Sequence, residues 1–123
     1  CSPELTAMLG SAIATAISDI PFDGPCATTQ IGMVGGFFVV NPNEEQMAVS
    51  DLKLTVASTG DKVIMIEAGA NEIPDEKMVE AIYKADSVNK EIIAFIDKIV
   101  AEKLSNPLQK QFIFSLPSCI VKE

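Results

Sequence analysis

Two short stretches of this sequence carry the side chains that could do chemistry. In the first, Asp51 opens an alternating apolar segment, and Glu67 closes a second apolar segment further along the chain. Two carboxylates spaced two residues apart on one face of a strand would suit Mg²⁺ or Mn²⁺, which prefer oxygen ligands. The position in phase with Asp51 is Lys53, however. The pattern therefore predicts no metal site here, and a strand-start residue that forms an ion pair with Lys53 or caps a backbone N–H.

The second stretch is Ser2-Pro3-Glu4, which opens an amphipathic helix. A helix N-terminus with free N–H groups and small hydroxyl side chains is an anion site. Here Pro3 removes one N–H donor. Glu4 brings a like charge, whose repulsion at about 4 Å and an effective dielectric of about 20 is near 4 kcal/mol. The helix dipole, worth about 0.3–1 kcal/mol, cannot offset that, so we expect no phosphate here.

Composition narrows the possible functions. The 123 residues are 48% hydrophobic, which favours one folded domain. Nine lysines and 17 acidic residues give a net charge of −8, and the sequence contains no arginine. The chain alone is therefore expected to bind RNA or DNA poorly. Three scattered cysteines without histidine argue against zinc and for a reducing compartment. No leader or apolar run long enough for a membrane span is visible, which favours the cytoplasm, and the start at Cys1 suggests a fragment.

Hydrophobic periodicity predicts an α+β fold. Apolar residues at helical spacing predict a helix over Ser2 to Ile20 with one buried face, and a second long helix from Pro74 to Lys103 whose weak patch is Asp86 to Asn89. Four strands between them form two hairpins, giving an antiparallel four-stranded sheet with the two long helices on one face. Residues 1–104 are the predicted domain, and 105–123 a linker or edge strand. The predicted strands are Cys26 to Val34, Phe37 to Asn41, a strand beginning at Asp51, and Val63 to Ala68, the last covered on both sides.

Four motifs in this order resemble bacterial polynucleotide phosphorylases. They are "AMLGSAIATAISDIPFDGP", "NPNEEQ", "SDLKLTVAS" and "IMIEAGANEI", and the resemblance covers Ser2 to Glu102. It is to the later half of the first ribonuclease-PH-type domain, and it implies a ribonuclease-PH, ribosomal-protein-S5-domain-2-like half. The resemblance also implies a parent enzyme that degrades RNA from the 3′ end with inorganic phosphate and Mg²⁺ or Mn²⁺. Such enzymes are ring-shaped trimers, in which the first domain copy has mostly lost the chemistry.

Several residues of this chain differ from the pattern of the family, and these differences bear on its function. The first copy usually has "SDLDL" where this chain has Asp51-Leu52-Lys53, often an arginine at Gln30, and a glycine-histidine pair near Ala85-Asp86. We therefore predict no catalytic, phosphate-binding, metal-binding or cofactor-binding residue in this chain. The leading hypothesis is a scaffold half-domain of a phosphorolytic exoribonuclease. The alternatives are a stand-alone protein-interaction module on the same fold, and a residual catalyst in which Asp51 and Glu67 hold a metal together.

Overall fold

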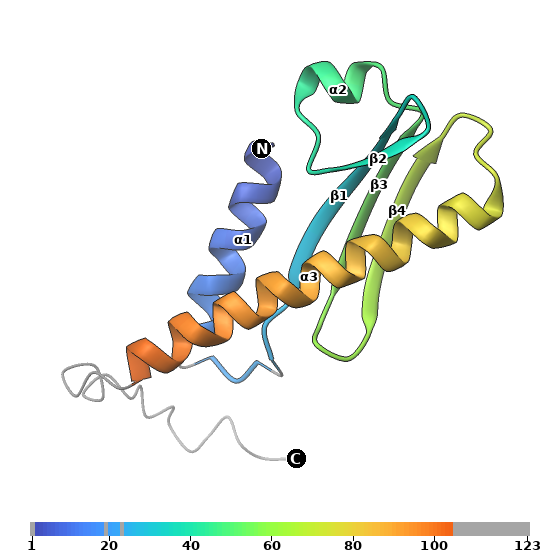
Figure 1. The fold of residues 1–123 in the computed structure, drawn as a ribbon. Helices are drawn as coiled ribbons and strands as arrows, with labels where there is room; N and C mark the ends of the chain where they lie inside the picture. Colours follow the sequence, from blue (N-terminus) through green and yellow to red (C-terminus); the bar gives the residue numbers. More distant parts are fainter. Residues whose placement is uncertain (1, 19, 23, 105–123) are drawn as a thin grey trace, which may run out of the picture.

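The computed structural model describes residues 2–18, 20–22 and 24–104 of the chain. The predicted tail over 105–123 lies outside the described residues. Figure 1 shows the elements in chain order, and none of the described helices is long and apolar enough to cross a membrane. The elements are α1 (Pro3–Ala16), β1 (Ala27–Val34), β2 (Phe37–Val40), α2 (Glu44–Ala48), β3 (Leu52–Ser58), β4 (Val63–Ala70) and α3 (Asp75–Leu104).

The four strands form one antiparallel sheet in the order β2-β1-β3-β4. The β1–β2 hairpin turns at Gly35 and Gly36, whose φ angles of 58° and 83° suit glycine. The β3–β4 hairpin joins it through the pairing of β1 with β3. The α+β fold with a four-stranded antiparallel sheet is thus confirmed.

Local signals explain where the helices begin. The Ser2 side chain caps α1 and Pro3 occupies its first turn, as predicted. Asn43 caps the short helix α2 through a capping box with Gln46. Acidic residues in the first turns of α2 and α3 suit the positive end of each helix dipole; they are Glu44, Glu45, Asp75 and Glu76.

The long helix α3 covers one face of the sheet. It is continuous from Asp75 to Leu104, so the weak patch at Asp86 to Asn89 produces no break. It packs across β1 and β3 (Figure 1), with Ala81 and Ala85 fully buried over the sheet. Small side chains at these positions let the helix approach the strands closely. The strand side of this core consists of Ile31, Met33, Leu52, Leu54 and Val56.

A buried carboxamide joins α3 to two strands at once. Asn89 is completely buried, and its Nδ2 donates to the Val56 carbonyl oxygen at 3.0 Å and to Ser58 Oγ at 2.9 Å. Its Oδ1 accepts a hydrogen bond of 2.7 Å from Thr29 Oγ1. Both amide hydrogens and the oxygen are therefore satisfied inside the core, which is the condition for burying an amide at low cost.

Two predictions about burial were wrong. We expected strand Val63 to Ala68 to be covered on both sides, but all of β4 is exposed because it lies at the sheet edge and α3 crosses β1 and β3 instead. We also expected one buried face on the first helix. Only Leu5 is buried, while Met8 and Leu9 keep 43% and 36% of their surface exposed, although α1 contacts β1 and α3.

Replacing Asn89 should destabilise the fold more than any surface change on the same helix. In Asn89→Leu the new side chain has a similar volume, but the Thr29 and Ser58 hydroxyls and the Val56 carbonyl lose their hydrogen-bond partner. We therefore expect the free energy of unfolding to fall by about 2–3 kcal/mol. Urea denaturation followed by circular dichroism measures it. Ser87→Leu, at an exposed position two residues earlier, is the control and should change stability by less than about 0.5 kcal/mol. Equal losses in the two variants would contradict this account.

Asp86, one turn before Asn89, gives the fold a pH-dependent contribution. The hydrogen bond from Lys90, at 2.7 Å, lowers the pKa of Asp86 below its ordinary value of 3.8, while Oδ1 is buried without a hydrogen-bond partner. Because the pKa is lowered in the folded chain, ionised Asp86 stabilises the fold above that ordinary value. The stabilisation is lost as the pH falls through the lowered pKa.

We therefore expect Asp86→Asn to destabilise the chain near pH 7 and to have a smaller effect near pH 3, measured by urea unfolding at the two pH values. Lys90→Gln should remove the same pH-dependent difference, and the double variant should add little to either single change. A difference that is equal at both pH values would show that Asp86 acts through packing rather than charge.

Candidate functional site

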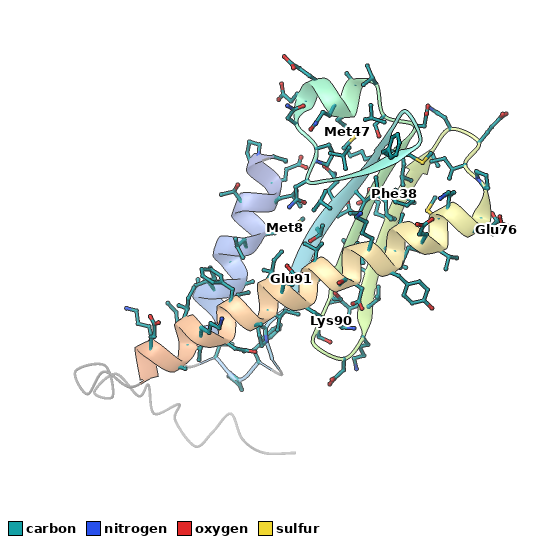
Figure 2. All side chains as sticks on the ribbon, in the orientation of Figure 1. Met8, Phe38, Met47, Glu76, Lys90 and Glu91 are labelled. Atoms are coloured by element: carbon teal, nitrogen blue, oxygen red, sulfur yellow. The ribbon has the colours of Figure 1, made fainter. Side chains whose placement is uncertain are left out.

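The first helix, the short helix and the sheet enclose a hollow of about 790 Å³. Figure 2 labels Met47 of α2, which forms part of its wall. The hollow collects the residues that the sequence analysis singled out at the helix start and on the third strand. It is lined by Ser2, Pro3, Glu4, Gln30, Pro42, Asn43, Glu44, Glu45, Met47 and Lys53.

The start of α1 offers few backbone donors to this hollow. Pro3 has no N–H. The Glu4 N–H already donates to Ser2 Oγ at 3.2 Å, and the Thr6 N–H donates to the Ser2 carbonyl oxygen at 3.2 Å. The Ser2 hydroxyl oxygen therefore acts as the cap of this helix.

The charge around the hollow is mainly negative. Three carboxylates, Glu4, Glu44 and Glu45, line it together with one ammonium group, that of Lys53. Glu4 is exposed, so water and salt screen its repulsion and the sequence-based estimate is an upper bound. The sign of the field nevertheless disfavours an oxyanion.

Asp51 is held at the entrance of β3 by its backbone. Its N–H donates to the Met33 carbonyl oxygen, and its own carbonyl oxygen accepts from the Asn71 N–H, both at 2.9 Å. The side chain is exposed and does not line the hollow. Asp51 therefore acts through its main chain, as a residue that starts a strand.

The predicted ion pair between Asp51 and Lys53 is wrong. Asp51 lies in the bend before β3, whereas Lys53 lies within the strand, and no ion pair joins these two described residues, in contrast to Lys77–Glu80 and Lys90–Asp86. Lys53 pairs with Gly32 on one side and Gly69 on the other. Because neither glycine has a side chain to cover it, the lysine stem is open toward the hollow.

The residual-catalyst alternative required Asp51 and Glu67 to share a metal. Glu67 pairs with Thr55 in the sheet, while Asp51 bonds to Asn71, four residues beyond Glu67. At about 3.3 Å per residue along a strand, the two carboxylates are about 13 Å apart. Among the described residues, no group of three acidic, cysteine or histidine side chains could hold a metal ion, and one carboxylate beside a lysine does not fit Mg²⁺ or Mn²⁺.

Sequence reasoning missed Ser50 and noted Gln30 only as a departure from the family, although both residues shape this site. Ser50 Oγ accepts from the Met33 N–H at 2.8 Å and donates to the Leu52 carbonyl oxygen at 2.6 Å, which fixes where β3 begins. Gln30 is buried, and its Nε2 donates to Thr55 Oγ1 at 3.3 Å. One available signal was Gly32, the cross-strand partner of Lys53, because an added Cβ there would come within 3.1 Å of Ser50 Oγ and of Pro42.

The geometry defines an α+β domain with a β2-β1-β3-β4 sheet under a long helix, and a hollow at the start of α1 whose lining is mainly acidic. Residues 24–87 match the family described as "3' exoribonuclease family, domain 2". The chain belongs to this family. The match includes all four strands and the first part of α3.

Alignments with curated relatives cover more of the chain than the family match does. The polyribonucleotide nucleotidyltransferase of Lachnoclostridium phytofermentans is 76% identical over 102 residues, and those of Clostridioides difficile and Anoxybacillus flavithermus are 51% and 52% identical over the same length. Each alignment covers 83% of this chain but only 14–15% of the relative. The chain therefore corresponds to a small part of proteins of this kind, as the resemblance indicated.

Inorganic phosphate should not stabilise this chain. A site with a millimolar dissociation constant would add about 1.4 kcal/mol at about 10 mM phosphate, which a thermal melt detects. We expect no shift in the melting temperature relative to chloride at the same ionic strength. The lack of donors at Ser2 and Pro3 and the acidic lining are the physical reasons. A clear shift that disappears in Ser2→Ala would show that an anion does bind at the start of α1.

Proposed function

We propose that this chain serves as a non-catalytic half-domain within a phosphorolytic 3′-to-5′ exoribonuclease, a polyribonucleotide nucleotidyltransferase. The family match and the 76% identity to a protein of that name support the assignment to this kind of enzyme. In the proposed role, the chain contributes scaffold and trimer contacts while another part of the longer protein carries out the reaction.

The acidic hollow at the start of α1 is the observation that carries this proposal. A phosphorolytic centre must hold inorganic phosphate and an RNA phosphate next to each other, which requires donors and cations. The hollow has one ammonium, three carboxylates and a proline in their place. At the position in phase with Asp51, where a second carboxylate would be needed to hold a metal, the chain has Lys53, which is itself a cation. These residues suit a structural wall better than a reaction centre.

The proposed partners belong to the longer enzyme. Its substrates are RNA and inorganic phosphate, its metal is Mg²⁺ or Mn²⁺, its assembly is a homotrimer, and its location is the cytoplasm. The net charge of −8 and the lack of arginine oppose RNA binding by this chain, because its field repels the phosphate backbone. RNA affinity is therefore assigned to other parts of the longer protein.

One observation favours the alternative of a protein-interaction module. The edge strand β4 is exposed along its full length and carries large apolar side chains, as strands that add to a partner's sheet do. The length of the reading frame separates the two functions. A frame that continues into an upstream sheet half and a downstream second ribonuclease-PH copy supports the enzyme, whereas a frame that ends at this chain supports the module.

The proposal predicts that Asp51 and Lys53 are dispensable for catalysis. In the longer enzyme, Asp51→Asn and Lys53→Gln should leave the rate of nucleoside diphosphate release from RNA within about two-fold, because neither side chain supports the transition state. The 123-residue chain alone should release none. A loss of several orders of magnitude in Asp51→Asn, or release by the chain alone, would show a working centre here.

A further inference from the structure

The strand β4 leaves an apolar sheet edge without a partner in the described part of the chain. It is the last strand of the sheet, and all eight of its residues are exposed. Its first half is the most apolar, with Val63, Ile64, Met65 and Ile66 exposing 36%, 54%, 41% and 50% of their surface. Unpaired backbone groups beside large apolar side chains favour the addition of another strand.

Charges of opposite sign flank this apolar half. The segment runs Lys62-Val63-Ile64-Met65-Ile66-Glu67, with a lysine immediately before four apolar residues and a glutamate immediately after them. Read in the opposite direction, the same segment places glutamate where lysine was. A copy that runs antiparallel can therefore match it in charge as well as in hydrophobicity.

An irregularity in β4 places both charges on the same face of the sheet. Val63 pairs with Ser58 and Ile66 pairs with Val56, so one extra residue enters β4 at the register shift between Ala57 and Ser58. Ser58 bonds to Asn89 of α3 and Val56 belongs to the core below α3, which puts Val63 and Ile66 on the α3 face. By alternation, Lys62 and Glu67 then both lie on the opposite face.

We propose that β4 pairs with β4 of a second copy of this chain across a two-fold axis between Ile64 and Met65. In this antiparallel register, Lys62 lies opposite the partner's Glu67, Val63 opposite the partner's Ile66, and Ile64 opposite the partner's Met65. Each pair occurs twice because the axis exchanges the two copies. The extra residue of each strand lies next to the two-fold axis, so the two irregularities are adjacent and neither one interrupts a regular part of the other strand.

The face assignment is what makes this register possible. An axis perpendicular to the sheet keeps each residue on its own face, so residues that oppose each other must share a face. In a regular strand, Lys62 and Glu67 are five positions apart and would lie on opposite faces. The extra residue corrects this difference, and the lysine–glutamate pairs form on the face away from α3.

Other registers are less favourable. Overlap of the full strand, with Val63 opposite the partner's Ala70, sets Glu67 opposite the partner's Ile66 although the two lie on different faces, and it pairs Val63 and Ile64 with the small residues Ala70 and Gly69. A slip of one further residue puts Glu67 directly opposite the partner's Glu67, and like charges directly opposite are destabilising. The lysine–glutamate register alone avoids both faults among these three.

Sedimentation velocity on the 123-residue chain over a range of concentrations tests the proposal. We expect a monomer–dimer equilibrium. Glu67→Lys and Lys62→Glu should each raise the dimer dissociation constant by at least about ten-fold, because each turns two attractive pairs into two repulsive ones. The double variant with both substitutions restores the pairs in reverse and should return to within about three-fold of the unaltered chain.

Two controls isolate the strand. Glu91→Lys changes the net charge as Glu67→Lys does, but on an exposed position of α3 (Figure 2), and should leave the dimer unchanged. Hydrogen exchange should slow at the amides of residues 63–66 as the concentration rises. Circular dichroism melts of every variant verify that each one folds.

Several outcomes would overturn the proposal. They are a chain that stays monomeric at all concentrations, single charge variants that dimerise like the unaltered chain, and a double variant that does not recover. Loss of the dimer on deleting residues 105–123, without any effect of the charge variants, would assign the edge to the tail of the chain instead. The phosphate and RNA assays above do not depend on dimer formation, so failure here leaves the proposed function standing.

Discussion

The three hydrogen bonds of the Asn89 carboxamide fix how the long helix lies on the sheet. They tie one position of α3 to Thr29 of β1 and to Val56 and Ser58 of β3. Apolar packing alone lets a helix slide or rotate over strands at modest cost, whereas a buried amide is satisfied in only one arrangement. Because Asn89 places α3 over β1 and β3, it also leaves β4 outside the covered area. The hydrogen bonds of Asn89 thus account both for the covering of β1 and β3 by α3 and for the exposure of β4.

The same constraint shapes the hollow on the other face of the sheet. Once β1 and β3 are held in register, Gln30 and Lys53 point toward the start of α1, and the glycines beside Lys53 keep the space open. The backbone therefore forms a cavity whose chemistry is set by the side chains that line it. Pro3, Glu4, Glu44 and Glu45 make that lining unfavourable for an anion. Position and chemistry are separate properties of this scaffold.

The sequence predicted the elements well and their partners less well. Caps, turns and periodicity are local, so Ser2, Gly35-Gly36 and the start of α3 could be placed within a few residues. Burial depends on contacts between segments far apart in sequence. The apolar run of β4 resembled a covered strand because its composition does not reveal that it lies at an edge. Asn89 resembled a weak point of a helix, because its hydrogen-bond partners are 31 to 60 residues away.

Two of the exposed apolar surfaces in the described part of the chain, on α1 and at β4, differ in what can cover them. On α1, the exposed residues Met8 and Leu9 project from a helix whose backbone is already hydrogen-bonded, so any apolar surface of suitable shape will serve. At β4, N–H and C=O groups that have no partner among the described residues accompany the apolar side chains, and only another strand satisfies both. The exposed face of α1 can therefore accept many kinds of apolar partner, whereas the edge of β4 accepts only another strand. Since Lys62 and Glu67 add charge to that selection, recognition by this chain is expected to begin at the edge of its sheet.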